Sequence, residues 1–340
     1  MTDERSPAPQ RDRSVLRRGV TLALAWVVAA SAVATGPAAQ PAQAASGQSG
    51  VVAPTSSQAV KNQRVLGLDG RFTILLLGSD ARPSEPGMRT DAILVASVDP
   101  VTRRAAVFSI PRDTVNFPLS ATRRYPGKIN ALYQSLSKST KTPGTALRKI
   151  IGSALGIEID AFALVGFAGF RKLVNNAGGL DVTVTRAFYD RVYSIRKGQR
   201  GFGLTRGRHH LRDLRALAFA RTRHADSDYA RARRQQQLIV SAIQKVRAGD
   251  LRLVVALLAA SRGLVKTDLP LADAPRILAI VARADLVRAR RTVFEPSTCA
   301  TMISSSKIVL KMTTCKAWIK RNFPPVHPGG AWPPPVAPRP

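Results

Sequence analysis

Acidic residues are scarce in this 340-residue chain, with 21 Asp and Glu against 52 Lys and Arg and a formal net charge of +31. A charge of this size does not specify a fold, but it constrains the partners of the protein. Nucleic acid, anionic lipid head groups, pyrophosphates and acidic polymers are the candidates. A general arginine-rich composition would explain part of the same excess.

Several other features are missing. The chain has no Gly-x-x-x-x-Gly-Lys-Ser/Thr phosphate loop, no Gly-x-Ser-x-Gly nucleophile elbow and no evident DNA-binding module. Its histidines do not combine with cysteines at a zinc-finger spacing. The two cysteines, Cys299 and Cys315, fit either one disulfide in an exported protein or two separate thiols, and we expect the disulfide.

The first apolar run follows a short polar segment that contains five arginines. We expect residues 1–18 to form a cytoplasmic tail and residues 19–36 a membrane anchor or a signal segment that sends the rest outward. Ala42-Gln43-Ala44 matches a signal-peptidase site, so both readings stay open. In either case the globular part is predicted to lie outside the cytoplasm, on the membrane or secreted.

The remaining organisation follows from composition. Residues 37–63 are rich in Ala, Ser, Gln and Pro and predict a flexible linker, and residues 324–340 predict an extended Pro-rich tail. Between them, residues 64–323 form the predicted globular domain.

Strand and helix patterns are mixed within that domain. Apolar runs predict strands over 72–77, 92–98, 105–110, 162–165 and 180–184. Helical spacing covers 131–155 with a break at Pro143-Gly144, and then 166–176, 211–220 and 229–246. Two more helical stretches within 251–286 and a late strand over 291–294 follow. The pattern predicts a layered α/β domain.

Charged side chains stand where the first strands end. Asp80 follows the first strand and Asp91 precedes the second, and two carboxylates at one sheet edge suit a hard cation such as Mg²⁺. Arg82 and Arg89 are placed to grip phosphate oxygens. A loop salt bridge is the alternative for any one of these pairs.

The third strand is followed by Pro111, Arg112 and Asp113, which we expect at the same edge. Lys128 is placed to reach an anion, and Asn130 to cap the helix after it.

The densest charge lies between residues 186 and 234, with fourteen basic and four acidic residues. Asp228 is predicted to cap the following helix. On that helix Arg231, Arg234 and Gln235 share a face with Leu238, which suggests a pyrophosphate grip. A solvated basic face is the alternative.

Taken in order, these segments resemble the LytR-CpsA-Psr family. The motifs are Leu75–Arg82, Arg89-Thr90-Asp91, Ser109–Thr114, Lys128-Ile129-Asn130, Gly178–Val182, Arg221-Thr222-Arg223 and Asp228–Gln236. They span residues 72–246, and each is weak alone but specific in this order. The pair Tyr229-Ala230 departs from the Phe-Gly or Phe-Asp that the family often has there.

The resemblance implies a three-layer α/β/α fold with a central mixed sheet and a long apolar pocket for a polyprenyl chain. It implies Mg²⁺, or Mn²⁺, on Asp80 and Asp91. The implied pyrophosphate ligands are Arg82, Arg89, Arg112, Lys128, Arg221, Arg223, Arg231, Arg234 and Gln235. Among the charged residues, those given the catalytic roles are Arg89, Arg112, Asp113, Arg221 and Arg231.

The implied reaction moves a glycopolymer from a polyprenyl-pyrophosphate donor to peptidoglycan. Phosphoryl transfer needs positioning and charge neutralisation more than covalent help, and a metal with arginines provides both. Three alternatives remain: a basic nucleic-acid-binding regulator, a polyprenyl-pyrophosphate hydrolase with the same site, and a non-catalytic wall-polymer-binding protein. The intact Asp80, Asp91 and Arg112 argue against the last of these. The predicted export segment argues against the regulator, and we expect no nucleic-acid partner.

Overall fold

The computed structural model describes residues 66–67, 69–80, 88–196, 198–247 and 264–324. The predicted tail, membrane segment and linker lie outside these residues, as does the Pro-rich tail after Pro324. Among the described residues, no helix combines the length and the apolar character needed to cross a membrane.

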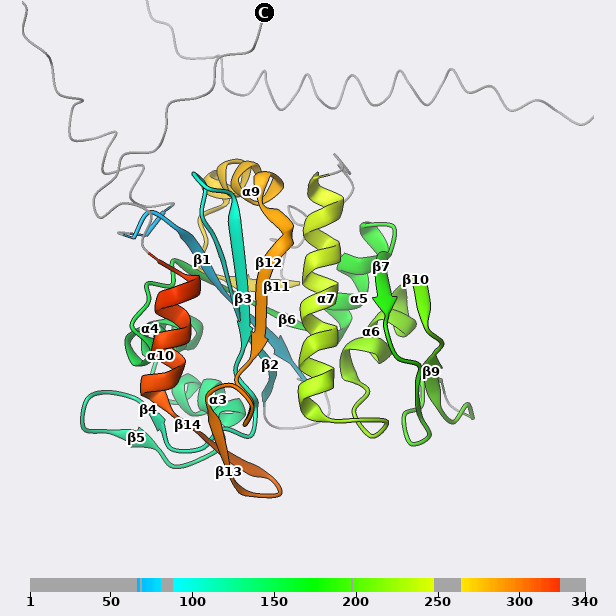
Figure 1. Cartoon of the computed structure of the whole chain (residues 1–340), viewed down its shortest axis with the longest axis horizontal. Coiled ribbons are helices and arrows are strands. Elements are labelled where there is room, and N and C mark those ends of the chain that lie inside the picture. The colour runs from blue at the N-terminus through cyan, green and yellow to red at the C-terminus, as the bar shows by residue number, and fades with distance from the viewer. Residues whose placement is uncertain (1–65, 68, 81–87, 197, 248–263, 325–340) are drawn as a thin grey trace, which may run out of the picture. The chain divides into compact units, whose positions relative to one another are not determined.

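A six-stranded mixed sheet forms the centre of the domain (Figure 1). Its strand order is β11-β6-β1-β2-β3-β12, where β1 pairs antiparallel with β2 and parallel with β6, and β3 pairs antiparallel with β2 and parallel with β12. The strands are β1 Phe72–Ser79, β2 Thr90–Val98, β3 Arg104–Ser109, β6 Ala161–Gly166, β11 Val265–Thr267 and β12 Asp285–Val293.

Helices cover both faces of this sheet because its strands are apolar on both sides. Leu75, Val95 and Phe108 belong to a core shared with α3 Leu132–Ser137, α4 Pro143–Leu155 and α10 Met312–Asn322. The alternate residues Leu94 and Val107 face the other way, where α7 Asp228–Arg247 and α9 Ala274–Arg283 lie (Figure 1). The predicted α/β fold with a central mixed sheet is thus confirmed.

A smaller layer packs against the far side of α7. It contains α5 Phe167–Asn176, α6 Asp213–Arg221 and four short strands in two pairs, with Leu238 of α7 in its core. The strands are β7 Leu180–Val184, β8 Phe188–Asp190, β9 Phe202–Leu204 and β10 Gly207–Leu211. The last three were not predicted, because short strands among arginine-rich turns have no long apolar run.

Two helix predictions are corrected. Leu211, predicted to begin a helix, ends β10 opposite Leu180, and extended backbone at Arg212 delays α6 to Asp213. Pro143, predicted to break a helix, begins α4 instead, since proline fits the first helical turn. The earlier segment ends as α3 at Ser137, after a 3-10 turn over Ile129–Ala131.

The C-terminal segment belongs to the main core. Strands β13 Ala300–Ser304 and β14 Lys307–Leu310 form a hairpin that leads into α10. Cys299 and Cys315 are joined by a disulfide and are both buried in the core with Ile308. The remaining short pair, β4 Phe117–Pro118 and β5 Arg124–Tyr125, lies near this hairpin in the view of Figure 1.

Candidate active site

A bulge at the end of β2 positions Asp91. The ladder pairs Gly78 with Ala92 and Ser79 with Thr90, so Asp91 is the extra residue without a partner on β1. Such a bulge changes the direction of a side chain. Asp91 Oδ2 accepts a hydrogen bond from Arg112 Nη1 over 3.1 Å, and its Oδ1 accepts one from Asn130 Nδ2 over 3.3 Å.

Arg112 is the centre of the charged cluster. It follows β3, and besides Asp91 its guanidinium lies 3.6 Å from Asp113 Oδ2 and 3.8 Å from Asp228 Oδ2. Lys128 completes this side by donating to Asp113 Oδ1 over 2.6 Å. Burial alone would lower the pKa of Arg112, but the charges of Asp91, Asp228 and Asp113 outweigh it and raise this pKa. Arg112 therefore stays cationic.

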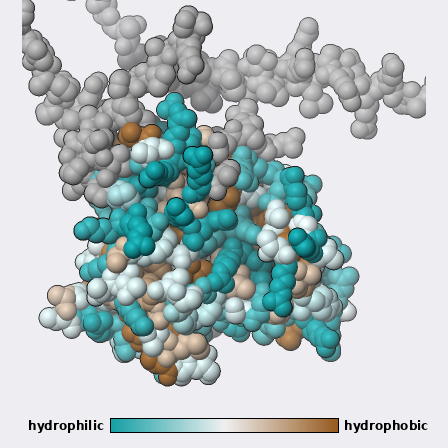
Figure 2. All heavy atoms as spheres, in the orientation of Figure 1, coloured by the Kyte–Doolittle hydropathy of each residue, from teal (hydrophilic) through white to brown (hydrophobic). Residues whose placement is uncertain are grey.

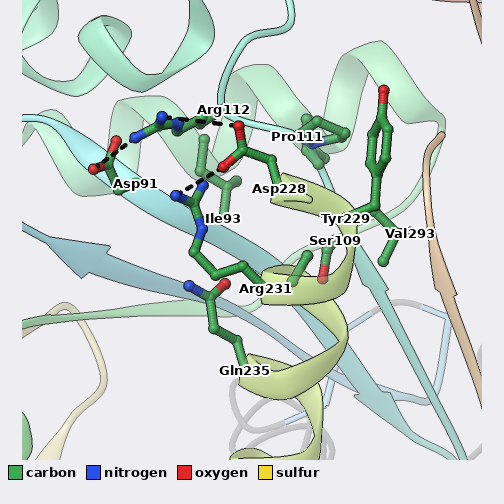
Figure 3. Close-up of a pocket in the computed structure, with 12 residues that line it drawn as sticks. Asp91, Ile93, Ser109, Pro111, Arg112, Asp228, Tyr229, Arg231, Gln235 and Val293 are labelled. Atoms are coloured by element: carbon green, nitrogen blue, oxygen red, sulfur yellow. Dashed lines mark hydrogen bonds and ion pairs between the residues drawn. The ribbon is translucent and has the colours of Figure 1, made fainter. Parts of the chain in front are cut away.

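Asp228 is the first residue of α7, and Ser227, not Asp228, caps this helix. Ser227 Oγ accepts the backbone N–H of Ala230 over 3.1 Å, so the prediction that Asp228 is the cap is wrong. Asp228 instead contacts Arg231 Nη1 at 2.9 Å and lies between Arg112 and Arg231 in Figure 3. The predicted cap at Asn130 is also wrong, since its amide donates to Asp91.

A pocket opens beside these charges. It is lined by Asp91, Arg112, Asp228, Arg231 and Gln235, with Ser109, Pro111, Tyr229 and apolar residues around them (Figure 3). Arg231 is buried, which lowers its pKa, and Arg112 and Arg223 lower it further while Asp228 and Asp91 act against them. Arg223 lies 3.9 Å from the same Asp228 carboxylate.

Within the described residues, seven charged side chains therefore form one network, three carboxylates and four cations. They are Asp91, Asp113, Asp228, Arg112, Lys128, Arg223 and Arg231. Asp228 was missing from the predicted site. Its spacing of three residues from Arg231 on one helix was the available signal.

Arg221 and Arg234 have other surroundings. The guanidinium of Arg221 lies 4.2 Å from the ring centroid of Phe167 and 5.6 Å from that of Tyr193. Arg234 is buried, with contacts to the carboxylate of Asp226 and the carbonyl oxygens of Phe219 and Thr222. Arg234 thus holds the loop between α6 and α7, whereas the sequence placed it at the pyrophosphate.

Asp190 holds the same loop from its other side. Its Oδ2 accepts hydrogen bonds from the Thr222 hydroxyl and from the backbone N–H groups of Arg223 at 3.1 Å and His224 at 3.0 Å. Desolvation would raise the pKa of this fully buried carboxyl, but these hydrogen bonds lower it well below its usual range. Asp190 and Arg234 together hold the segment that carries Arg223.

Asp80 and Arg89 lie at the neighbouring strand ends. Asp80 Oδ1 accepts the backbone N–H of Arg89 over 2.9 Å, and the Asp80 N–H donates to the Arg89 carbonyl over 3.1 Å. The Arg89 side chain is exposed, and Arg82 lies outside the described residues. No group of three or more His, Cys, Asp or Glu side chains within the described ranges is arranged to hold a metal ion. Asp80 and Asp91 are carboxylates of the kind that Mg²⁺ commonly takes as ligands together with phosphate oxygens, and the Mg²⁺ site stays a prediction.

The chain was compared with known proteins. A family model described as "LytR_cpsA_psr family" matches residues 40–294. The polyisoprenyl-teichoic acid–peptidoglycan teichoic acid transferase TagV of Bacillus subtilis is 32% identical over 179 residues, 52% of this chain and 44% of TagV. The transferase of the same description, TagU, from Enterococcus faecalis is 30% identical over 66% of this chain and 70% of its own length.

One further relative and one solved structure are also similar to this chain. The regulatory protein MsrR of Staphylococcus aureus is 30% identical in sequence over 59% of this chain and 58% of its own length. The crystal structure of B. subtilis TagV superposes with a TM-score of 0.58, at 24% identity, over 75% of this chain and 98% of that one. This chain thus spans only about half the length of TagV and MsrR as curated.

Proposed function

Because this chain belongs to the LytR-CpsA-Psr family, we propose that it is a phosphotransferase that moves a glycopolymer from a polyprenyl-pyrophosphate carrier to peptidoglycan. The observation that carries the proposal is the position of Arg112, which contacts carboxylates from two other elements at the rim of the pocket. The transferase names of TagV and TagU support it.

The proposed reaction is a displacement at phosphorus. The hydroxyl oxygen of the acceptor attacks the glycan-bearing phosphorus and forms a phosphodiester. The anhydride P–O bond breaks, polyprenyl phosphate leaves with the bridging oxygen, and the hydroxyl proton passes to a base. Such a reaction depends mainly on positioning and on stabilising negative charge.

The arginines of the network are suited to that charge. The carboxylate of Asp228 lies between the guanidinium groups of Arg112 and Arg231, with one oxygen towards each (Figure 3). Both guanidinium groups can donate hydrogen bonds to pyrophosphate oxygens. Arg223 is on the loop that Asp190 and Arg234 hold, and Gln235 lines the pocket one turn after Arg231. We assign Arg89, Arg221 and Lys128 to the approach of the donor, where cationic side chains attract it.

We propose Asp80 and Asp91 as the residues that hold Mg²⁺ or Mn²⁺. When bound, the ion would neutralise charge on the pyrophosphate. Asp113 is the proposed base, because its carboxylate lies 3.6 Å from Arg112, which we propose to contact the pyrophosphate. The Lys128 ammonium keeps its carboxylate oriented. Asp91 is the second candidate for this role.

The predicted apolar segment at residues 19–36 supports a location at the cell membrane, with the domain outside the cytoplasm. At that location the domain would meet the proposed lipid-linked donor and the nascent wall. The long apolar pocket implied for the lipid chain stays a prediction.

The proposal is tested with the purified full-length chain, a polyprenyl-pyrophosphate oligosaccharide, Mg²⁺ and nascent peptidoglycan. Glycan attached to the wall strand, together with released polyprenyl phosphate, is the expected result. An Arg112→Ala variant should form both products at least a hundredfold more slowly. Release of phosphate products without attachment would favour a hydrolase, and the absence of both across several donors would contradict catalysis.

A further inference from the structure

The backbone of the loop that carries Arg112 and Asp113 is held from two directions. On one side the segment before α3 contributes two bonds: Asn130 N–H donates to the Arg112 carbonyl over 3.3 Å, and Ile129 N–H donates to the Thr114 carbonyl over 2.7 Å. Those donors come from the Lys128-Ile129-Asn130 motif. This side of the loop is thus held by residues close to the site in the sequence.

The other side is held by a residue almost two hundred positions later. Ile308 N–H donates to the Asp113 carbonyl over 3.2 Å, and Val115 N–H donates to the Ile308 carbonyl over 2.9 Å. The two bonds form a parallel bridge between Thr114 and Ile308. Ile308 thus holds the loop on the side opposite to Ile129 and Asn130. Together, these three N–H groups bond the carbonyl oxygens of all three residues from Arg112 to Thr114.

Ile308 is in turn fixed by the hairpin to which it belongs. It pairs with Met302 across the β13–β14 ladder, and its side chain is buried in the main core. The Cys299–Cys315 disulfide joins the residue before β13 to α10, the helix that follows β14. Lys311 N–H donates to the Cys299 carbonyl over 2.7 Å. An ion pair between Arg233 of α7 and Glu295 attaches the start of this segment to the helix of Arg231.

We propose that Ile308 is a positioning residue for the transfer reaction, and that the Cys299–Cys315 disulfide holds it against the Asp113 loop. This inference rests on the proposed function for its effect on turnover, but the contact itself does not. Small displacements of Arg112 matter because a shift of about 1 Å can cost about a hundredfold in rate. Without the hairpin, the loop would lose both backbone bonds to Ile308 and would keep those from Ile129 and Asn130 on its other side.

The test removes the Ile308 N–H with Ile308→Pro in the full-length chain. A matched control is available at the hairpin tip, where Ile303 has no partner in the ladder and is 54% exposed. Figure 2 shows apolar surface at the lower end of the molecule, where Figure 1 draws this hairpin. Ile303→Pro introduces the same residue into the same hairpin without removing a bond to the loop.

Two readouts report on Arg112 without requiring turnover. One is the Nε–Hε resonance of Arg112 in arginine-labelled protein, assigned through Arg112→Lys. The other is the affinity for inorganic pyrophosphate by calorimetry. We expect Ile308→Pro to shift the resonance, to weaken pyrophosphate binding about tenfold and to lower kcat by about a hundredfold. Ile303→Pro should match the wild type in all three.

If Ile308→Pro does not fold, the double variant Cys299→Ala/Cys315→Ala replaces it in the test. We expect the double variant to change the same three readouts in the same direction. An unchanged Arg112 resonance and pyrophosphate affinity in a folded variant would overturn the inference, as would an equal effect of Ile303→Pro. If the wild type transfers no glycan while Ile308→Pro still shifts the resonance, the proposed function fails and the positioning role stands.

Discussion

Asp228 contacts Arg231 from one helical turn away, with 2.9 Å between Oδ1 of the aspartate and Nη1 of the arginine. Its other oxygen lies 3.8 Å from Arg112 Nη2. A single carboxylate thus occupies the space between two arginines in which the proposed function puts phosphate oxygens. Binding of pyrophosphate would therefore exchange one anion for another at this position.

Removing that carboxylate charge should favour the incoming anion. We expect Asp228→Asn to raise the affinity for inorganic pyrophosphate by roughly tenfold, since it removes a like charge within a few ångströms. Calorimetry measures it, with Asp181→Asn as the control, because Asp181 is exposed and contacts His210 away from the network. A weaker affinity in Asp228→Asn would mean that Asp228 chiefly positions the arginines.

Arg112 should not be replaceable by another cation. Its guanidinium contacts Asp91, Asp113 and Asp228 through separate nitrogens, and the single ammonium of lysine cannot reproduce that fork. We expect Arg112→Lys and Arg112→Ala each to lower kcat about 10²- to 10³-fold. The exposed Arg104 provides the control, and an Arg112→Lys variant with near-normal turnover would contradict the prediction.

Asp190 should matter for stability as well as for the site. Asp190→Asn keeps only one side-chain oxygen, so it loses either the hydrogen bonds from Thr222, Arg223 and His224 or those from the Val192 and Tyr193 N–H groups. We therefore expect a loss of about 2 to 3 kcal/mol in the free energy of unfolding. Urea unfolding measures it. A change no larger than that of Asp181→Asn would show that the loop does not depend on this carboxylate.

The lowered pKa of Asp190 also has a pH consequence. The folded protein binds this proton more weakly than the unfolded chain, so the stabilisation is present above the ordinary aspartate pKa and is lost as the pH falls through the lowered one. Asp190→Asn should therefore lose less stability than the wild type on acidification. An identical acid dependence would contradict the assignment.

Asp160 should change the pH dependence of stability in the direction opposite to Asp190. Burial raises its pKa to about 8, although the Thr73 N–H lowers it, and Asp69 and Glu158 raise it further. The folded state then binds the proton more tightly, so stability falls as the pH rises from the ordinary value towards 8. Asp160→Asn keeps an acceptor for Thr73 and should flatten this dependence. Urea unfolding at pH 5 and pH 8 compares the two proteins, and equal slopes would refute the prediction.

Metal dependence can be separated from folding. We expect chelation of Mg²⁺ to abolish transfer, and Asp91→Asn to raise the Mg²⁺ concentration needed for half-maximal activity by more than tenfold, because one of two carboxylate ligands is lost. Asp91 also accepts a hydrogen bond from Arg112, so the substitution could act through folding instead of the metal. Urea unfolding of Asp91→Asn and the wild type separates the two effects. Full activity in chelator would contradict the metal proposal.

Much of the site was predictable because its residues flank apolar strands. Asp80 and Arg112 follow the runs that become β1 and β3, and Asp91 precedes the run that becomes β2. Strand ends at one edge of a sheet bring such residues together. Local pattern was sufficient there, since each residue's position depends on the strand next to it.

The remaining contacts depend on packing between distant segments. Whether Arg234 faces the pocket or the α6–α7 loop is decided by partners such as Asp226 and Phe188, which helical spacing does not identify. Ile308 acts through its backbone N–H and carbonyl, which every residue except proline has, so its contact with Asp113 leaves no pattern in the sequence.

The most direct test identifies the lipid product of a single turnover. The full-length chain is given one equivalent of polyprenyl-pyrophosphate glycan with Mg²⁺ and nascent peptidoglycan, and the lipid and wall fractions are analysed by mass spectrometry. Phosphotransfer predicts polyprenyl monophosphate in equal amount to glycan joined to the wall through a phosphodiester. Arg112→Ala should form both about 10²- to 10³-fold more slowly. Polyprenyl pyrophosphate as the released lipid, or monophosphate without wall-bound glycan, would contradict phosphotransfer.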